Sequence, residues 1–239
     1  MSGHNKWTQI KRQKGANDTK RSKIFAKLSK VITLCTKNGA DPDANPALHL
    51  AIEKAKQVNM PSDNIQKAIK KGTGELAGES LDEVLYEAYG PEGVALIIEA
   101  NTDNNNRTVS EVKNILSKNG GRFGESGSVK WMFDHFGYLE VALGGKADAE
   151  EIEMAAIEAG AEDVTQMEDM VVVFTKPENL YLVKSVLEKG GHSIMETGFE
   201  WKAKNKVAVS AETSAKIETL FDALDEQDDV NEVYSNLQD

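Results

Sequence analysis

The chain contains few of the residues on which catalytic and metal chemistry depends. Among its 239 residues are one cysteine, Cys35, and four histidines. A single cysteine cannot form an intramolecular disulfide, which fits a reducing compartment. The histidines show no metal-ligand spacing among themselves or with Cys35, and no motif supplies a nucleophile with a neighbouring base. These histidines are His4, His49, His135 and His192. We therefore expect no metal, no cofactor and no enzymatic activity.

Long apolar runs are missing as well. No run approaches the roughly 18 residues that a membrane-spanning helix needs, and the N-terminus lacks the apolar core of a secretory signal. The sequence therefore predicts a cytoplasmic protein with no membrane partner. Cys35 falls on the apolar side of a helical pattern, so a buried small side chain is favoured over a reactive thiol.

Acidic residues are almost absent from the start of the chain. The first 37 residues contain ten Lys/Arg and one acid, Asp18, although the formal net charge is −11. Residues 1–80 carry 15 Lys/Arg and 7 Asp/Glu, and the remaining 159 residues carry 13 and 32. Clustered positive charge acts over about 8 Å at physiological salt and attracts a polyanion by releasing its counterions. This asymmetry predicts a nucleic-acid-facing module joined to an acidic one.

Much of the positive charge falls on one predicted helix. From about residue 19 to residue 37, apolar residues recur at the spacing of one helical face, and lysines form a second arc. The helix can therefore bury one side and present a basic stripe on another; the alternative is a solvated helix flank. The stripe continues a basic segment before the helix, so the candidate nucleic-acid-binding residues are Lys6, Lys11, Arg12 and Lys14 in that segment, and Lys20, Arg21, Lys23, Lys27 and Lys30 in the helix.

The periodicity changes after about residue 79, from a helical to an alternating pattern. Before that point, the pattern predicts three short helices, the second of them capped by Asn45 and begun by Pro46. After it come strands and helices, including a strand near residues 129–133. Residues 136–201 follow the β-α-β-β-α-β order of a ferredoxin-like unit.

We thus expect an α+β protein with an N-terminal three-helix domain followed by two ferredoxin-like α/β domains, one inserted in the other. The expected domains are a basic helical domain of residues 1–80, a discontinuous α/β domain of 81–135 plus 202–239, and an inserted α/β domain of 136–201.

Two polar segments allow more than one interpretation. Residues 102–108 can form a turn with a helix N-cap, a recognition loop in which Arg107 contacts a phosphate, or both. Arg107 is therefore a further candidate nucleic-acid-binding residue. The acidic residues between 225 and 229 can attract cations, but a solvated helix end is the favoured interpretation.

Several motifs in the same order resemble the YebC family, which includes bacterial factors and the mitochondrial translational activator of cytochrome oxidase. The matching segments are Ser2 to Trp7, Arg21 to Leu28, Asp41-Pro42, Asn45-Pro46, Asn59 to Ile65, Lys71 to Gly74, Tyr89 to Pro91, Thr102 to Asn104, Asn106 to Thr108 and Gly127 to Val129. The resemblance implies three domains and a non-enzymatic regulatory role, in transcription or on the ribosome.

The leading hypothesis is a regulator of gene expression that contacts the phosphate backbone of DNA or ribosomal RNA through its basic domain. One alternative is a ribosome-associated translation factor acting on ribosomal RNA or tRNA, with the ribosome as partner. The other is an adaptor that binds a basic protein through the acidic α/β domains.

Overall fold

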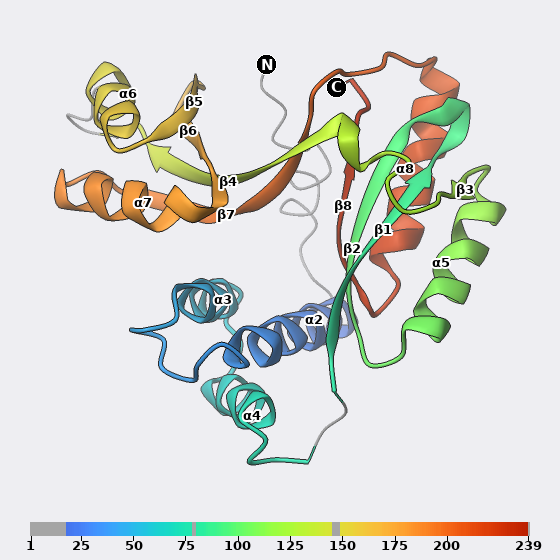
Figure 1. Ribbon diagram of the computed structural model, residues 1–239, viewed down its shortest axis with the longest axis horizontal. Helices are drawn as coiled ribbons and strands as arrows, with labels where there is room; N and C mark the ends of the chain where they lie inside the picture. The colour runs from blue at the N-terminus through green and yellow to red at the C-terminus, as the bar shows by residue number, and fades with distance from the viewer. Residues whose placement is uncertain (1–17, 78–79, 145–148, 239) are drawn as a thin grey trace. The chain divides into compact units, whose positions relative to one another are not determined.

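A computed structural model describes residues 18–77, 80–144 and 149–238. Within these ranges the chain packs as two units, one of residues 18–132 with 203–238 and one of residues 133–202. Helices accompany two four-stranded antiparallel sheets, as Figure 1 shows. This arrangement confirms the α+β class and the N-terminal helical region.

The helical region contains α2 (Asp18–Thr36), α3 (Pro46–Gln57) and α4 (Ser62–Gly72). The Asn45 side chain accepts a hydrogen bond from the Leu48 backbone N–H at 3.2 Å, so the predicted N-cap is confirmed. A Cβ atom on Gly72 would lie 2.5 Å from the Thr33 carbonyl oxygen, so only glycine permits the close approach of α4 to α2. The apolar faces meet in a core built on Ile32, Leu48, Ala51, Ala55, Met60, Ile65 and Ala68.

The first sheet has the strand order β3-β1-β2-β8. Its strands are β1 (Asp82–Tyr89), β2 (Ala95–Thr102), β3 (Arg122–Phe123) and β8 (Val230–Ser235), and its helices are α5 (Asn105–Lys118) and α8 (Ala211–Asp225). Alternate residues of β1 and β2 form one apolar face, as period-two side-chain alternation requires. Both helices pack on that face through Val112, Leu116, Ile217, Leu220, Phe221 and Leu224.

Residues 133–202 form the second sheet with its helices. The elements are β4 (Phe133–Ala142), α6 (Ala149–Glu158), β5 (Ala161–Gln166), β6 (Met170–Thr175), α7 (Leu180–Lys189) and β7 (Ile194–Ala203). The β-α-β-β-α-β order with strands arranged β5-β6-β4-β7 is the ferredoxin-like pattern expected from the sequence. Buried apolar side chains fill this unit, among them Leu139, Ile152, Phe174, Leu180 and Leu187.

Short 3-10 turns complete the fold: η1 (Pro91–Gly93), η2 (Lys130–Met132) and η3 (Pro177–Asn179). The strand expected at residues 129–133 is wrong, because η2 occupies most of that segment and β4 begins only at Phe133. Among the helices of the described ranges, none has both the length and the apolar character needed to cross a membrane.

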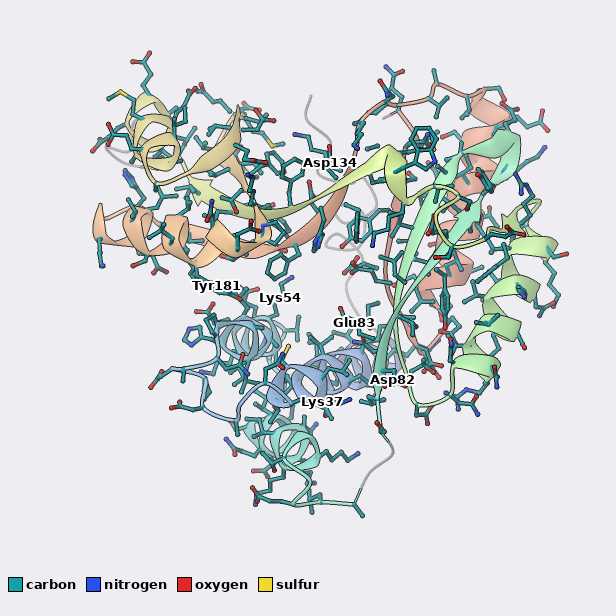
Figure 2. The ribbon with its side chains drawn as sticks, in the orientation of Figure 1. Lys37, Lys54, Asp82, Glu83, Asp134 and Tyr181 are labelled. Atoms are coloured by element: carbon teal, nitrogen blue, oxygen red, sulfur yellow. The ribbon has the colours of Figure 1, made fainter. Side chains whose placement is uncertain are left out.

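The single cysteine lies where α2 meets the start of β1. Cys35 is half-buried, and burial, reinforced by the Glu83 carboxylate, raises its pKa to about 11. Nearby, the Lys37 ammonium donates a hydrogen bond to the Leu81 carbonyl at 2.5 Å; Figure 2 labels Lys37 and Glu83 in this part of the molecule. The expectation of an unreactive thiol therefore has a physical basis, since the thiolate is the reactive form.

We predict slow modification of Cys35 by an aromatic disulfide reagent at pH 8. A pKa of about 11 leaves roughly a hundredfold less thiolate at that pH than an ordinary thiol has. Modification should accelerate by a similar factor in urea, where burial is lost. Equal rates in the folded and unfolded protein would contradict the burial argument.

Candidate nucleic-acid interface

Three lysines of the predicted stripe lie against the C-terminal end of α8. The Lys23 ammonium lies 2.5 Å from a Glu226 carboxylate oxygen. The Lys27 ammonium lies 3.1 Å from an Asp225 oxygen, and Lys30 lies 2.5 Å from an Asp229 oxygen. The spacing of these lysines along α2 puts them on one face of the helix, so a single face meets all three acids.

The same lysines also bind main-chain carbonyl groups. Lys23 donates to the Glu226 carbonyl at 3.0 Å, and Lys27 to the Asp225 carbonyl at 2.6 Å. Lys30 donates to the Asp228 carbonyl at 3.0 Å. The last carbonyls of a helix have no partner within the helix and carry partial negative charge. Since the last turn of α8 contains no basic residue, the lysines of α2 supply the positive charge that offsets the partial negative charge of these carbonyls.

Asp229 is the buried member of the acidic segment, with 2% of its surface exposed. One carboxylate oxygen accepts from Lys30, and the other accepts from the Thr108 hydroxyl at 2.6 Å and Arg107 at 3.0 Å. Burial alone would raise the pKa of Asp229, but these donors hold it well below its usual range. The interpretation of this segment as a solvated helix end is therefore wrong, because three lysines and Arg107 contact it.

Arg107 belongs to the polar segment that was open to two interpretations. Asn104 caps α5, since its side chain accepts from the Arg107 backbone N–H at 3.1 Å. The Arg107 guanidinium lies 2.5 Å from Asp103 and 3.0 Å from Asp229, and its side chain is 45% exposed. Its two carboxylate neighbours raise the pKa of Arg107 further above its ordinary value. The N-cap interpretation is confirmed, and a phosphate contact by Arg107 stays a prediction.

The other predicted binding residues are placed less fully. Arg21 is exposed, and its guanidinium carbon lies 5.8 Å from the centre of the Phe25 ring. Lys20 is in α2, but its side chain is outside the described part of the structure. Four candidates lie outside the described residues altogether: Lys6, Lys11, Arg12 and Lys14. The structure thus brings together Lys23, Lys27, Lys30 and Arg107.

Further cations on the helical region were not among the predicted site residues. Lys54, which Figure 2 labels on α3, and Lys56 fall in the last turn of that helix; Lys70 and Lys71 fall in the last turn of α4. Lysines at these positions favour the C-terminal end of a helix, which is their local explanation. The sequence could have indicated these lysines, because each pair stands at the end of a helical apolar pattern.

No group of three or more His, Cys, Asp or Glu side chains that could hold a metal ion occurs in the described ranges. The acidic segment at residues 225–229 instead binds lysine ammonium groups. The chemistry that this region offers is recognition of anionic oxygens by lysine and arginine.

Comparison with protein families gives two matches that together span most of the chain. The model described as "TACO1/YebC protein N-terminal domain" matches residues 5–75. The model described as "TACO1/YebC second and third domain" matches residues 81–237.

Individual proteins match over nearly the full length. A "probable transcriptional regulatory protein" of Fervidobacterium nodosum is 49% identical over 99% of this chain and 93% of the relative. A protein with the same description from Pseudothermotoga lettingae is 48% identical over 100% of this chain and 94% of the relative. The crystal structure of a conserved hypothetical protein from Aquifex aeolicus has a TM-score of 0.85 at 45% identity, covering 98% of this chain and 97% of that one.

Replacing Asp229 by Asn should destabilise the protein by about 2–4 kcal/mol, because Lys30 and Arg107 lose their shared buried counter-charge. The loss should also depend on pH. Since the folded pKa of Asp229 is lowered, its contribution is present above the unfolded pKa near 4 and disappears as pH falls. Urea unfolding between pH 7 and pH 3 measures both effects, and the variant should lose less stability on acidification than the wild type.

Asp228→Asn is the matched control, because Asp228 is exposed and adjacent in sequence. It should change the free energy of unfolding by less than about 0.5 kcal/mol. Equal destabilisation by the two substitutions would contradict the role assigned to Asp229.

Proposed function

Because the chain belongs to the TACO1/YebC family, we propose that it is a non-enzymatic regulator of gene expression that binds nucleic-acid phosphates through its basic helical region. The curated relatives are named probable transcriptional regulatory proteins, which supports a regulatory role. In this proposal residues 1–80 are the binding domain. The α/β domains, residues 81–135 with 202–239 and residues 136–201, carry the acidic charge.

The observation that carries the proposal is positive charge localised in an acidic protein. Residues 18–76 contain eleven Lys/Arg and six Asp/Glu, in a chain of net charge −11. Lys56, Lys67, Lys70 and Lys71 are exposed on α3 and α4. A polyanion is attracted to such a region, and binding then releases counterions from the polymer.

The stripe lysines bind the same chemical group in the protein that they would bind on a nucleic acid. Carboxylate and carbonyl oxygens at the end of α8 are anionic or partly anionic acceptors, as phosphate oxygens are. The Lys23–Glu226 pair has side-chain exposures of 35% and 60%. Exposed pairs of this kind contribute about 0–1 kcal/mol, so Lys23 can exchange Glu226 for a phosphate. Lys30 stays with buried Asp229.

The polymer is DNA or ribosomal RNA, since a lysine stripe recognises the phosphate backbone that both share. The names of the relatives favour DNA and a role in transcription. Ribosomal RNA would make the protein a translation factor. Sedimentation of a cell extract distinguishes these two, because the protein travels with chromosomal DNA in one case and with ribosomes in the other.

An adaptor is the second candidate, and the surface of residues 133–202 favours it. Met154, Ile157 and Leu182 are large apolar side chains with 63%, 54% and 57% of their surface exposed on α6 and α7. Helix α6 also carries Glu150, Glu151, Glu153 and Glu158. Apolar side chains beside acidic ones suit a basic amphipathic segment of another protein.

The double variant Lys23→Gln, Lys27→Gln should weaken binding to duplex DNA or ribosomal RNA and reduce its salt dependence. Each lost phosphate contact lowers the slope of log affinity against log salt by about 0.9 on B-DNA, so the slope should fall by about 1 to 2, with the larger share from the more exposed Lys23. Titrations of fluorescent DNA and RNA between 50 and 300 mM salt measure this change.

Lys67→Gln, Lys70→Gln is the matched control, because it removes the same charge from exposed positions on α4. It should lower the slope by less than the stripe variant does. An equal decrease in slope for the two variants would mean that binding depends only on the total charge of the helical region and not on the stripe. A protein that binds neither polymer, and retains its partner in both variants, would favour the adaptor.

Neutralising the partners of the stripe should have the opposite effect. In the variant Asp225→Asn, Glu226→Gln, Lys23 and Lys27 lose their competing carboxylates, so nucleic-acid affinity should rise about threefold to tenfold. The same titration measures it. The control Glu218→Gln, Asp222→Asn changes the net charge equally at exposed positions of α8. An equal rise in the control would show that only net charge matters.

A further inference from the structure

Trp131 is the most exposed of the large apolar side chains in the described ranges, with 66% of its surface open. It lies in η2, at the end of the segment of residues 124–132 that follows β3. A tryptophan exposed to this extent contributes little to the core. The contacts that hold this side chain therefore indicate what it does.

A buried carboxylate fixes the segment that carries Trp131. Glu87 of β1 accepts hydrogen bonds from the backbone N–H groups of Gly127 at 2.6 Å, Val129 at 2.7 Å and Lys130 at 2.8 Å. Burial acts to raise the pKa of Glu87, but these three donors lower it overall, so the side chain is ionised at neutral pH. The segment is therefore held on the first sheet by charge-assisted hydrogen bonds.

Two glycines allow the segment to approach β1 this closely. Gly127 has a φ of +83°, a conformation that other residues rarely adopt. A Cβ atom on Gly124 would lie 2.5 Å from the Ser128 hydroxyl oxygen and 3.1 Å from the Glu87 carbonyl oxygen. The backbone before Trp131 is thus preorganised.

The indole is also fixed, through its edge. The Trp131 Nε1–H donates to the Ser128 carbonyl at 3.1 Å, and the Tyr89 hydroxyl donates to the same carbonyl at 3.1 Å. Two donors on one oxygen lie no more than about 6 Å apart. Because the indole N–H already donates to the Ser128 carbonyl, a ligand can contact the exposed indole only through its ring face.

Cations accompany the two aromatic rings. The Arg122 guanidinium carbon lies 4.0 Å from the centre of the Tyr89 ring, in a cation–π contact. Lys130, next to Trp131, and Arg122 are both exposed. In the segment itself Glu125 is the exposed acid, while the buried charge of Glu87 interacts with the three backbone donors and with the nearby Lys130 ammonium. Trp131, Tyr89, Arg122 and Lys130 form what we call the Trp131 platform.

We infer that the Trp131 platform is a second nucleic-acid site, at which an unpaired base stacks on the indole while Arg122 and Lys130 contact the flanking phosphates. This inference rests on the proposed nucleic-acid function and adds to it recognition of single-stranded segments. Stacking on an aromatic ring tolerates any base, and the engaged N–H group leaves no donor for selecting one.

A proline-rich peptide is another ligand that pairs of aromatic rings bind. Such a peptide carries no phosphate, so it would make no use of Arg122 and Lys130. The two cations therefore favour a nucleic acid, and the peptide is one outcome of the test.

The test uses the full-length protein and two fluorescent 12-mers, one of oligo-U and one with abasic residues and the same number of phosphates. Wild-type protein should bind oligo-U about fivefold to a hundredfold more tightly than the abasic strand, the range that stacking supplies. Trp131→Ala should bring this ratio close to one, and Trp131→Phe should retain part of it. Phe199→Ala, at another exposed aromatic position, should leave the ratio unchanged.

The outcomes separate the two claims. The variant Lys23→Gln, Lys27→Gln should weaken both strands equally and keep the ratio. If wild type binds both strands equally and Trp131→Ala changes nothing, the platform is overturned and the proposed function stands. Binding to neither strand nor to duplex DNA or ribosomal RNA overturns the proposed function itself. A proline-rich peptide that needs Trp131, with no base-dependent binding, assigns the platform to a peptide and also overturns the inference.

A second readout does not depend on removing Trp131. In the variant Trp7→Phe, Trp201→Phe the remaining tryptophan is Trp131. Its fluorescence should be quenched on titration with oligo-U and stay unchanged with the abasic strand. Quenching of the same size by both strands would overturn the stacking contact.

Discussion

The Asp229 carboxylate is the charge around which the larger unit is organised. Removing a carboxylate from water costs several kcal/mol unless cations and hydrogen-bond donors replace the solvent. Here Lys30 comes from α2, and Arg107 and Thr108 come from the first turn of α5. One buried charge therefore joins the helical region, the helix α5 and the start of β8. The polar segment of residues 102–108 is structural for this reason, whatever else it contacts.

The same organisation keeps the lysines of the basic stripe from repelling one another. An unpaired stripe would repel itself and destabilise α2, since like charges four residues apart are unfavourable. The end of α8 supplies carboxylates and main-chain carbonyls at the required spacing, so the protein holds these lysines with acceptors similar to phosphate oxygens. In the proposed function, binding of a polyanion is an exchange of acceptors. Its net free energy is smaller than the charge count suggests, and it depends on salt and on the exposure of each pair.

Two buried carboxylates hold the two surfaces for which we propose backbone and base recognition. Asp229 holds Lys30 and Arg107 beside the lysines that we propose contact the phosphate backbone, a contact that carries no sequence information. Glu87 positions a loop and its tryptophan, which can contact a base. In both cases burial opposes ionisation, and several donors overcome that effect. Each carboxylate therefore holds its hydrogen-bonded neighbours in place, which would reduce the ordering cost of the proposed binding.

The sequence by itself determined the helices of the first region, their apolar faces, the N-cap at Asn45, the α+β class and the uneven charge. These features depend on neighbours within a few positions, through helical periodicity and capping. The tertiary structure alone decided that the acidic residues after α8 receive the lysines of α2, about 200 positions earlier, and that η2 replaces a strand before β4. The physical reason is that burial and electrostatic partners depend on distance in space, and local periodicity contains no information about which distant carboxylate or backbone donor will arrive.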